Sequence, residues 1–245
     1  MEGDNMEKIN KYSKKENYSF TLGAFPTYEL INKASDLVEF VYIHENYYEK
    51  ERLIDLLKFK NINYQISSKA INKLTKKESH LVVGVFEKFS KEIEDSSHVV
   101  LDNIADMGNL GTIIRSMNGF GINNLALVGQ VCDIFNPKTI RATMGSIFDI
   151  NFEHFDSMDD YIAKFGKDRR IKLFMLSRDE DDSLYKSDLS GKISLVFGNE
   201  GAGLPDFYEK YGDKVFIPQS ENVDSLNLTI AVGVGLYEYR RQNIG

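Results

Sequence analysis

The chain has 245 residues, of which 42% are hydrophobic, and a formal net charge of -7. This length can bury one or two hydrophobic cores, and no apolar run is long enough to cross a membrane. A single cysteine, Cys132, excludes an internal disulfide, and the first residues lack the pattern of a signal peptide, so we expect a protein of the reducing cytoplasm.

The first part of the chain is expected to form a small α/β sandwich behind a tail. Residues 1–16 are polar and lack periodicity, which is typical of a mobile tail. Thr27 is the expected N-cap of the first helix. Hydrophobic periodicity in the domain expected at residues 17–92 predicts helices within 27–34, 49–59 and 69–74 and strands at 38–43, 63–66 and 81–86.

A charged linker, residues 88–97, precedes the domain expected at residues 97–245. Strands and helices alternate in this domain, which indicates an open, mainly parallel α/β sheet with ligands at the carboxyl ends of its strands. The pattern predicts strands at 98–101, 124–128, 171–176, 193–197 and 215–217, and helices at 109–119, 137–144, 158–165 and 225–241, with a short segment near Pro205. Two glycines in the last helix would be costly unless something packs closely against them.

Positive charge is concentrated near the N-terminus. Residues 1–92 hold 15 Lys and Arg against 14 Asp and Glu, a net charge of +1, which leaves -8 of the total for residues 93–245. The N-terminal domain is therefore the better candidate for docking nucleic-acid phosphates, and its lysine clusters include Lys69, Lys73, Lys76 and Lys77. The four histidines show no metal-ligand spacing with each other or with Cys132, so we expect no metal.

The first of three polar blocks, residues 101–116, follows an apolar strand and opens a helix. A Gly-Asn-Leu-Gly corner places Asn109 near the helix start, and Arg115 follows nearly two turns later. We expect Arg115 to lie on an otherwise apolar face of this helix. A surface ion pair is the alternative role for Arg115.

The second block, residues 195–204, is an apolar strand followed by a turn with three glycines that also holds Glu200. Glycines at a strand end, beginning here with Gly198, let a ligand approach the backbone closely. No Gly-Lys-Ser/Thr follows, which excludes a P-loop, and no G-x-G-x-x-G follows the first strand of either half, which disfavours a dinucleotide-binding oxidoreductase. Neutralising a nearby helix end is the alternative role for Glu200.

The third block, residues 217–229, combines a proline turn with Ser225 and Asn227 at the expected start of the last helix. Ser225 or Asp224 is the expected cap, which would leave the side-chain amide of Asn227 free to bind something else. The alternative is a plain helix cap without a binding role.

Taken in chain order, the three blocks closely resemble the motifs of the SpoU/TrmH family of RNA ribose 2'-O-methyltransferases, which belong to the SPOUT class. The resemblance covers about residues 97–243 and includes a supporting stretch at 136–146. It implies a SPOUT-type α/β fold with a deep C-terminal trefoil knot, and a homodimer. The N-terminal half is similar in layout to the ribosomal-protein-like, substrate-binding domain of many family members that modify ribosomal RNA.

The resemblance also implies the chemistry, which is methyl transfer from S-adenosylmethionine to a ribose 2'-hydroxyl of RNA. The residues implied to hold the cofactor through their backbones are Gly198, Ile217 and Leu226. The residues implied to act on the nucleotide are Asn109, Arg115, Glu200, Ser225 and Asn227. A guanidinium stays protonated above pH 12, so we expect Arg115 to bind the phosphate beside the hydroxyl rather than act as a base.

Ribosomal RNA is the favoured substrate because of the two-domain layout. Two alternatives stay open: a transfer-RNA 2'-O-methyltransferase of the same family, and a catalytically silent RNA-binding assembly factor. The silent alternative depends on Glu221, which stands where relatives often have glycine.

Overall fold

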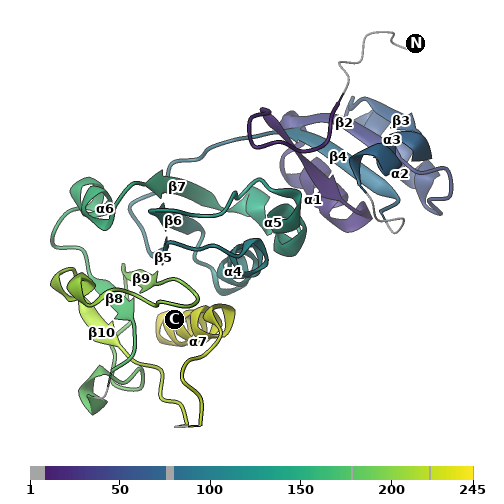
Figure 1. The fold of residues 1–245 in the computed structure, drawn as a ribbon. Coiled ribbons are helices and arrows are strands. Elements are labelled where there is room, and N and C mark those ends of the chain that lie inside the picture. The colour runs from purple at the N-terminus through teal and green to yellow at the C-terminus, as the bar shows by residue number, and fades with distance from the viewer. Residues whose placement is uncertain (1–8, 76–79, 178, 221, 245) are drawn as a thin grey trace. The chain divides into compact units, whose positions relative to one another are not determined.

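The computed structural model describes residues 9–75, 80–177, 179–220 and 222–244. It forms two compact units, coloured along the chain in Figure 1. The first unit contains the described residues up to Phe89 together with Phe135–Phe148, and the second contains Ser90–Ile134 and the described residues from Asp149 onward. The segment Phe135–Phe148 lies within the span expected for the second domain, yet it packs with the first unit.

The first unit is a four-stranded sheet, ordered β1-β4-β2-β3, with helices packed against it. Its strands are β1 (Tyr18–Leu22), β2 (Val38–Ile43), β3 (Tyr64–Ile66) and β4 (Val82–Glu87), and its helices are α1 (Ala24–Lys33), α2 (Lys50–Phe59), α3 (Ser68–Leu74) and α5 (Pro137–Thr143). One core lies between the sheet and the helices α1 and α2, and a second contains Ile71 of α3. The predicted α/β sandwich is therefore confirmed.

One local prediction in this unit was wrong, and one strand was not predicted. Helix α1 begins at Ala24 after Gly23, whose φ is 110°, so Thr27 lies inside the helix and not at its cap. The Thr27 side chain is buried, and its hydroxyl donates to the Gly23 carbonyl at 2.8 Å. Strand β1 was not predicted, because its inward positions include the polar but fully buried Ser19 and Thr21, which hide the apolar alternation.

Residues 9–16 of the expected tail contact the first unit. The Lys88 ammonium donates to the backbone carbonyls of Lys14 at 3.0 Å and Glu16 at 2.7 Å, and lies 4.9 Å from the ring centre of Tyr12. Residues 1–8 of the tail lie outside the described residues, as do Lys76 and Lys77 of the lysine cluster.

The second unit contains a six-stranded sheet with the order β10-β8-β9-β5-β6-β7, and every neighbouring pair is parallel. The strands are β5 (His98–Asp102), β6 (Asn124–Val128), β7 (Asn151–Phe155), β8 (Ile171–Phe174), β9 (Ser194–Phe197) and β10 (Asp213–Val215). The parallel α/β sheet is confirmed. Strand β7 was not predicted because Asn151, Glu153 and His154 interrupt its apolar residues.

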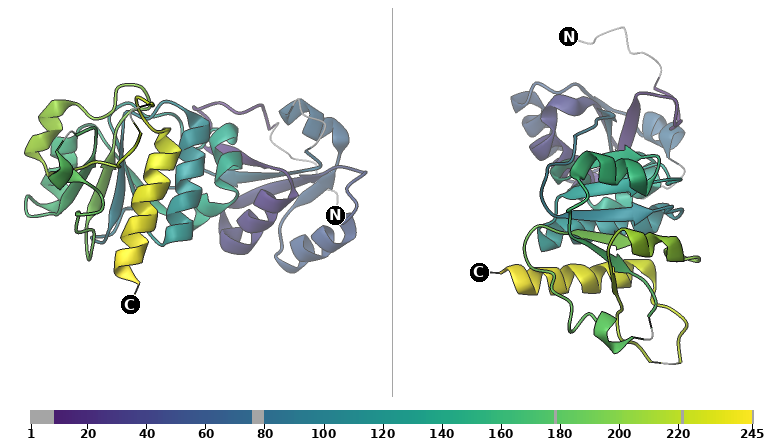
Figure 2. Two further views of the ribbon diagram at one scale, coloured as in Figure 1. Left: turned by 90° about the horizontal axis from the view of Figure 1, so that it is seen from below. Right: turned by 90° about the vertical axis from the view of Figure 1, so that its left-hand side faces the viewer.

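Helices cover both faces of this parallel sheet. Helices α4 (Met107–Phe120) and α7 (Leu228–Asn243) lie side by side on one face, as the left-hand view of Figure 2 shows. Helix α6 (Met158–Phe165) packs on the other face, against β6 and β7. The remaining helical turns are η1 (Ser35–Leu37), η2 (Ser146–Asp149), η3 (Glu180–Asp182) and η4 (Asp206–Lys210). Among the described residues, no helix is long and apolar enough to span a membrane.

A glycine allows α7 to pack closely on the sheet. A Cβ added at Gly235 would lie 2.8 Å from the Phe174 ring and 3.1 Å from the Phe197 ring. These two rings stack with their centres 4.3 Å apart. The expectation of close packing is therefore met at Gly235, whereas a Cβ at Gly233 would meet nothing within 4 Å in the described chain.

A polar cluster is buried at the amino ends of the central strands, the edge opposite the strand ends that carry the polar blocks. The His98 ring nitrogen Nδ1 forms a hydrogen bond of 2.7 Å with the Tyr161 hydroxyl. This hydroxyl also forms a hydrogen bond of 2.6 Å with the Ser194 hydroxyl. The Arg169 guanidinium contacts Ser194 and the Ser96 carbonyl. Burial lowers the pKa of His98 to about 4, so this imidazole is neutral in the folded protein at neutral pH.

We expect acid to destabilise the fold through His98. Its folded pKa is lower than its ordinary value of 6.5, so the unfolded state binds more protons, and stability is lost as pH falls from 6.5 towards 4. The loss reaches about 3 kcal/mol across that window. Urea unfolding at several pH values measures it. His98→Gln should flatten this pH dependence and His154→Gln, at an exposed position of β7, should not; equal slopes in both variants would contradict the assignment.

Candidate active site

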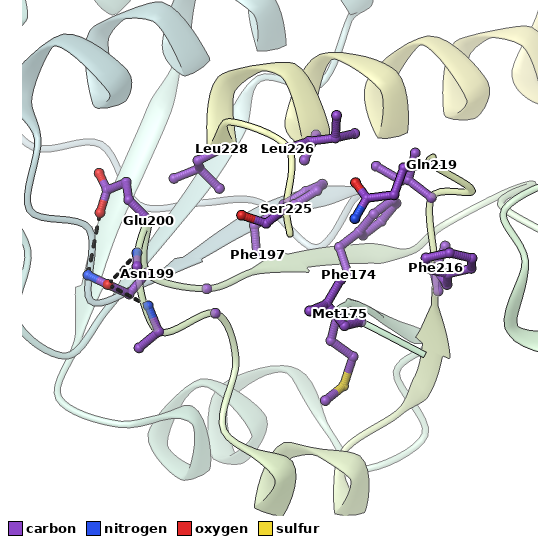
Figure 3. A pocket seen from close by; sticks show the side chains of 18 residues that line it. Phe174, Met175, Phe197, Asn199, Glu200, Phe216, Gln219, Ser225, Leu226 and Leu228 are labelled. Carbon is purple, nitrogen blue, oxygen red and sulfur yellow. Dashed lines mark hydrogen bonds between the residues drawn. The ribbon is translucent and has the colours of Figure 1, made fainter. Parts of the chain in front are cut away.

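A cavity of about 190 Å³ opens at the carboxyl edge of the parallel sheet, within the second unit. Figure 3 shows it between the loops that follow β8, β9 and β10 and the start of α7. The lining residues lie in the segments 174–176, 197–203, 215–219 and 225–231. Parallel α/β sheets bind ligands at this edge, so the cavity is the candidate active site.

The cavity brings together residues from two of the three polar blocks. All three predicted cofactor-binding residues, Gly198, Ile217 and Leu226, line it, and so do Glu200 and Ser225. Three other predicted residues, Asn109, Arg115 and Asn227, are not among its lining residues.

The loop after β9 folds back on itself, and this requires glycine at position 198. A Cβ on Gly198 would lie 2.2 Å from the carbonyl carbon of Gly203 and 2.4 Å from the nitrogen of Leu204. The Gly203 amide donates to the Asn199 carbonyl at 2.9 Å, which closes the loop. The sequence interpretation assigned this glycine to close approach of a ligand, but in the structure the loop's own backbone occupies that space.

Glu200 connects this loop to the start of α4. Its carboxylate accepts hydrogen bonds from the Asp106 amide at 3.1 Å and from the Asn109 side-chain amide at 3.2 Å. Burial raises the pKa of Glu200, but hydrogen bonds from the backbone, including that of Asp106, and from Asn109 outweigh burial and hold the pKa below its ordinary value. Glu200 is thus an acceptor-only carboxylate at neutral pH, and it orients Asn109.

Asn227 is itself the N-cap of α7, which corrects the prediction that Ser225 or Asp224 would cap this helix. Its side-chain oxygen accepts from the Thr229 amide at 2.9 Å and from the Thr229 hydroxyl at 2.6 Å. Asn has the acceptor that a helix start needs, and the helix begins three residues later than expected. The Asn227 amide nitrogen makes no hydrogen bond within the part of the chain that the structure describes.

The prediction that Arg115 lies on an apolar face was wrong. The buried face of α4 contains Leu110, Ile113, Ile114 and Met117, whereas Arg115 is exposed. Its guanidinium forms no ion pair or hydrogen bond with any described residue. Arg115 is therefore not the surface ion-pair partner considered as an alternative, and its five donors are open to an anion from outside the chain.

The walls of the cavity fit a nucleoside cofactor with an amino-acid tail. The Phe174 and Phe197 rings, Leu226 and Leu228 supply an apolar surface. The backbone N–H and C=O groups of Ile217 and Leu226 make no hydrogen bonds among the described residues, so they can pair with the edge of a ring. Sequence reasoning did not assign residues 174–176 to the site, although they form the carboxyl end of the strand predicted at 171–176 and therefore lie at the same edge.

A cysteine thiolate and a metal ion would be two further kinds of reactive centre for the described part of this edge. Burial, together with the charges of Glu200 and Asp106, raises the pKa of the half-buried Cys132 thiol to about 11, so it is not a thiolate at neutral pH. Among the described residues, no group of three His, Cys, Asp or Glu side chains is placed to hold a metal ion. Glu221 lies outside the described residues.

The fold and site define an α/β protein whose cofactor-sized cavity is built by loops at the carboxyl edge of a parallel sheet. The chain matches the SpoU rRNA Methylase family over residues 96–237, more than half of its length. It belongs to this family, and the resemblance noted from the three polar blocks is confirmed.

Individual relatives agree with this membership. An uncharacterized tRNA/rRNA methyltransferase from Synechocystis sp. is 34% identical over 145 residues, 59% of this chain and 53% of that protein. A 23S rRNA (uridine(2479)-2'-O)-methyltransferase from Streptomyces viridochromogenes is 32% identical over 156 residues, 62% of this chain and 54% of that protein. The chain thus spans about half the length of these curated relatives. The crystal structure of an AdoMet-bound rRNA methyltransferase from Sinorhizobium meliloti superposes with a TM-score of 0.77 at 27% identity, covering 94% of this chain and 89% of that chain.

Proposed function

We propose that this protein transfers a methyl group from S-adenosylmethionine to a ribose 2'-hydroxyl of ribosomal RNA. The observation that carries the proposal is the contact between Glu200, at the rim of the cavity, and Asn109 in the first turn of α4. The same helix bears Arg115, which is unpaired among the described residues. The same helix thus carries a residue held at the rim of the cavity and an exposed cation suited to an RNA phosphate. The names of the relatives, which include 23S rRNA 2'-O-methyltransferases, support ribosomal RNA over transfer RNA.

The bound cofactor would supply an electrophilic methyl group, and the protein residues would supply position and charge. Gly198, Ile217 and Leu226 would hold it through their backbones. The Asn109 amide, fixed by Glu200, would orient the ribose, and the Arg115 guanidinium would bind the adjacent phosphate. Such a bidentate contact lowers the pKa of the hydroxyl and fixes its direction, so that it can lose its proton to a phosphate oxygen or to water.

The direct test combines binding with product analysis. Calorimetry should show binding of S-adenosylmethionine to the full-length protein, and incubation with a 23S rRNA transcript should yield a 2'-O-methylated nucleotide detected by mass spectrometry. The same assay with a transfer-RNA pool distinguishes the transfer-RNA alternative. Absence of any cofactor binding at millimolar concentration would favour the catalytically silent assembly factor.

The first unit is proposed to dock the RNA. Lys69 is exposed and unpaired among the described residues, and the Lys73 ammonium donates to the Ile9 carbonyl, at 3.4 Å. We expect Lys69→Ala with Lys73→Ala to weaken RNA binding and to reduce the slope of log K against log salt by about 1 to 2, because fewer counterions are released. Titrations at several salt concentrations measure this slope. Substitution of Lys167, an exposed lysine of the second unit, is the control; the same slope in all three proteins would remove the docking role.

A homodimer, a C-terminal trefoil knot and a cytoplasmic location belong to the same proposal. Ile230 and Tyr237 of α7 are 55% and 60% exposed, and Gly233 lies between them on the helix surface with open space around it. An apolar face with a central glycine suits close contact with a second copy of the chain. We expect Gly233→Leu to shift the protein from dimer to monomer in analytical ultracentrifugation. Gly119→Leu is the control, because Gly119 is another helical glycine with open space around it. A monomeric wild-type protein would contradict the dimer.

A further inference from the structure

Asn103, which does not line the cavity, lies directly after β5 in a backbone conformation that side chains rarely adopt. Its φ is 54°, in the left-handed region. Each of its polar atoms has a partner. Its backbone amide donates to the Val128 carbonyl at 3.0 Å, and its side-chain oxygen accepts from the Gln130 amide at 2.8 Å. The residue is therefore fixed to the end of the neighbouring strand β6.

Two further contacts hold Asn103 from the other side. Its side-chain nitrogen donates to the Asp102 carboxylate at 2.9 Å, and this carboxylate also accepts from the Tyr208 hydroxyl at 2.7 Å. Asp102 and Tyr208 are both buried. The fit is tight, because a Cβ on Gly129 would lie 2.6 Å from the Asn103 side-chain oxygen.

The Asn103 carbonyl, fixed in this way, is the anchor of the cavity loop. It accepts a hydrogen bond from the side-chain nitrogen of Asn199 at 2.8 Å. The side-chain oxygen of Asn199 accepts from the amides of Gly201 at 2.9 Å and Ala202 at 3.1 Å. The side-chain oxygen of Asn199 therefore holds the internal shape of the loop, and its side-chain nitrogen fixes the position of the loop relative to Asn103.

The next residue in this loop is Glu200, which holds Asn109. A shift of the loop away from Asn103 would carry the Glu200 carboxylate away from the start of α4. We propose that Asn103 is a positioning residue for the methyl-acceptor side of the site, acting through Asn199 on the Glu200–Asn109 contact. This inference rests on the proposed methyltransferase function.

Loss of the Asn103–Asn199 contact should affect turnover and cofactor affinity differently. Losing the Asn103–Asn199 contact leaves the internal shape of the loop, and therefore the cofactor site, intact, because the bonds from Gly201 and Ala202 to Asn199 remain. Losing the Asn103–Asn199 contact would, however, make the position of Asn109 relative to the RNA less fixed. The measured change should therefore fall on turnover and not on cofactor affinity.

Three variants of the full-length protein test this. Asn103→Gly tolerates the left-handed backbone but deletes both side-chain contacts. Asn199→Asp removes the donor to Asn103, together with a longer contact of 3.4 Å from the same nitrogen to the Glu200 carboxylate, and keeps the acceptor for the loop amides. Asn61→Gly is the matched control, since Asn61 is also an asparagine with positive φ, at 57°, and it lies in the first unit.

With a 23S rRNA transcript as the probe, Asn103→Gly and Asn199→Asp should each lower kcat about tenfold and leave the Kd for S-adenosylmethionine within about threefold. The double variant should lose no more than the worse single variant, because both act through one contact. Asn61→Gly should match the wild type. Multiplicative losses in the double variant, or a loss of thermal stability with unchanged kcat, would overturn the proposal.

Amide hydrogen exchange provides a readout that needs no RNA. The Ala105 and Asp106 amides donate to Glu200, so their exchange should accelerate in Asn103→Gly and Asn199→Asp and stay unchanged in Asn61→Gly. Unchanged exchange in the two site variants would overturn the positioning role. A wild-type protein that transfers no methyl group would instead overturn the proposed function, and the exchange measurement would still decide the inference.

Discussion

Replacing Gly198 by valine should abolish binding of S-adenosylmethionine, with a loss of affinity of more than about a hundredfold. The reason is the loop itself. The first atom of any side chain at this position would lie 2.2 Å from the backbone of Gly203, a distance that non-bonded atoms do not adopt. The loop must therefore open, and the cavity wall that it forms is lost.

Calorimetry of the cofactor with the purified variant measures this prediction. Gly201→Ala is the matched control in the same loop, because its added Cβ has only an ordinary contact, 3.6 Å from the Asn199 side chain. We expect its affinity to stay within about threefold of the wild type. Circular dichroism should show both variants folded, since the parallel sheet does not depend on this loop. Wild-type affinity in Gly198→Val would exclude the loop as part of the cofactor site.

Removing the guanidinium of Arg115 should lower turnover by about a hundredfold or more while leaving cofactor affinity nearly unchanged. Arg115 is exposed, has no partner among the described residues, and does not line the cavity, so its loss affects neither the fold nor the cofactor wall. Asn109→Ala should have a similar effect, because it removes the group that Glu200 orients.

Single-turnover kinetics with saturating cofactor measure the effect. Arg115→Lys keeps the charge but loses the bidentate fork, and comparing its pH–rate profile with that of the wild type separates phosphate binding from base catalysis. Arg241→Ala, at an exposed helical arginine of the same unit that is paired with Glu238, should retain full activity. If the Arg115 and Asn109 variants lose cofactor binding before they lose turnover, the proposed division of the site is wrong.

Several features of the site could be predicted because they are local. A glycine-rich turn after an apolar strand, and a polar pair before a helical pattern, identify strand ends and helix starts from neighbouring residues alone. Five of the eight predicted residues line the cavity for this reason. The parallel orientation of the strands in the second sheet was predicted in the same way, from the alternation of strands and helices.

Other features depend on partners that are distant in sequence. The error over Arg115 is of another kind, because the spacing of Leu110, Ile113, Ile114 and Met117 already indicates the buried face of α4 and leaves Arg115 outside it. The cap of α7 shifted to Asn227, since Ser225 and Leu226 are taken up by the cavity wall. Strand β1 escaped prediction because Thr21 finds its hydrogen-bond partner in Thr27 only after folding.

The sequence by itself determined most of the helices and strands, the parallel orientation of the second sheet and the residue types at its strand ends, because these depend on periodicity and on residue type. Only the tertiary structure decided which groups meet. The contact of Glu200 with Asn109 and the hydrogen bond from Asn199 to Asn103 join residues that are 91 and 96 positions apart. The same holds for Phe135–Phe148, which packs with the first unit although it lies between the first and second polar blocks in the sequence. Parallel neighbouring strands are joined by long crossover connections, so residues that meet at their ends are far apart in the sequence and no local pattern predicts their contact.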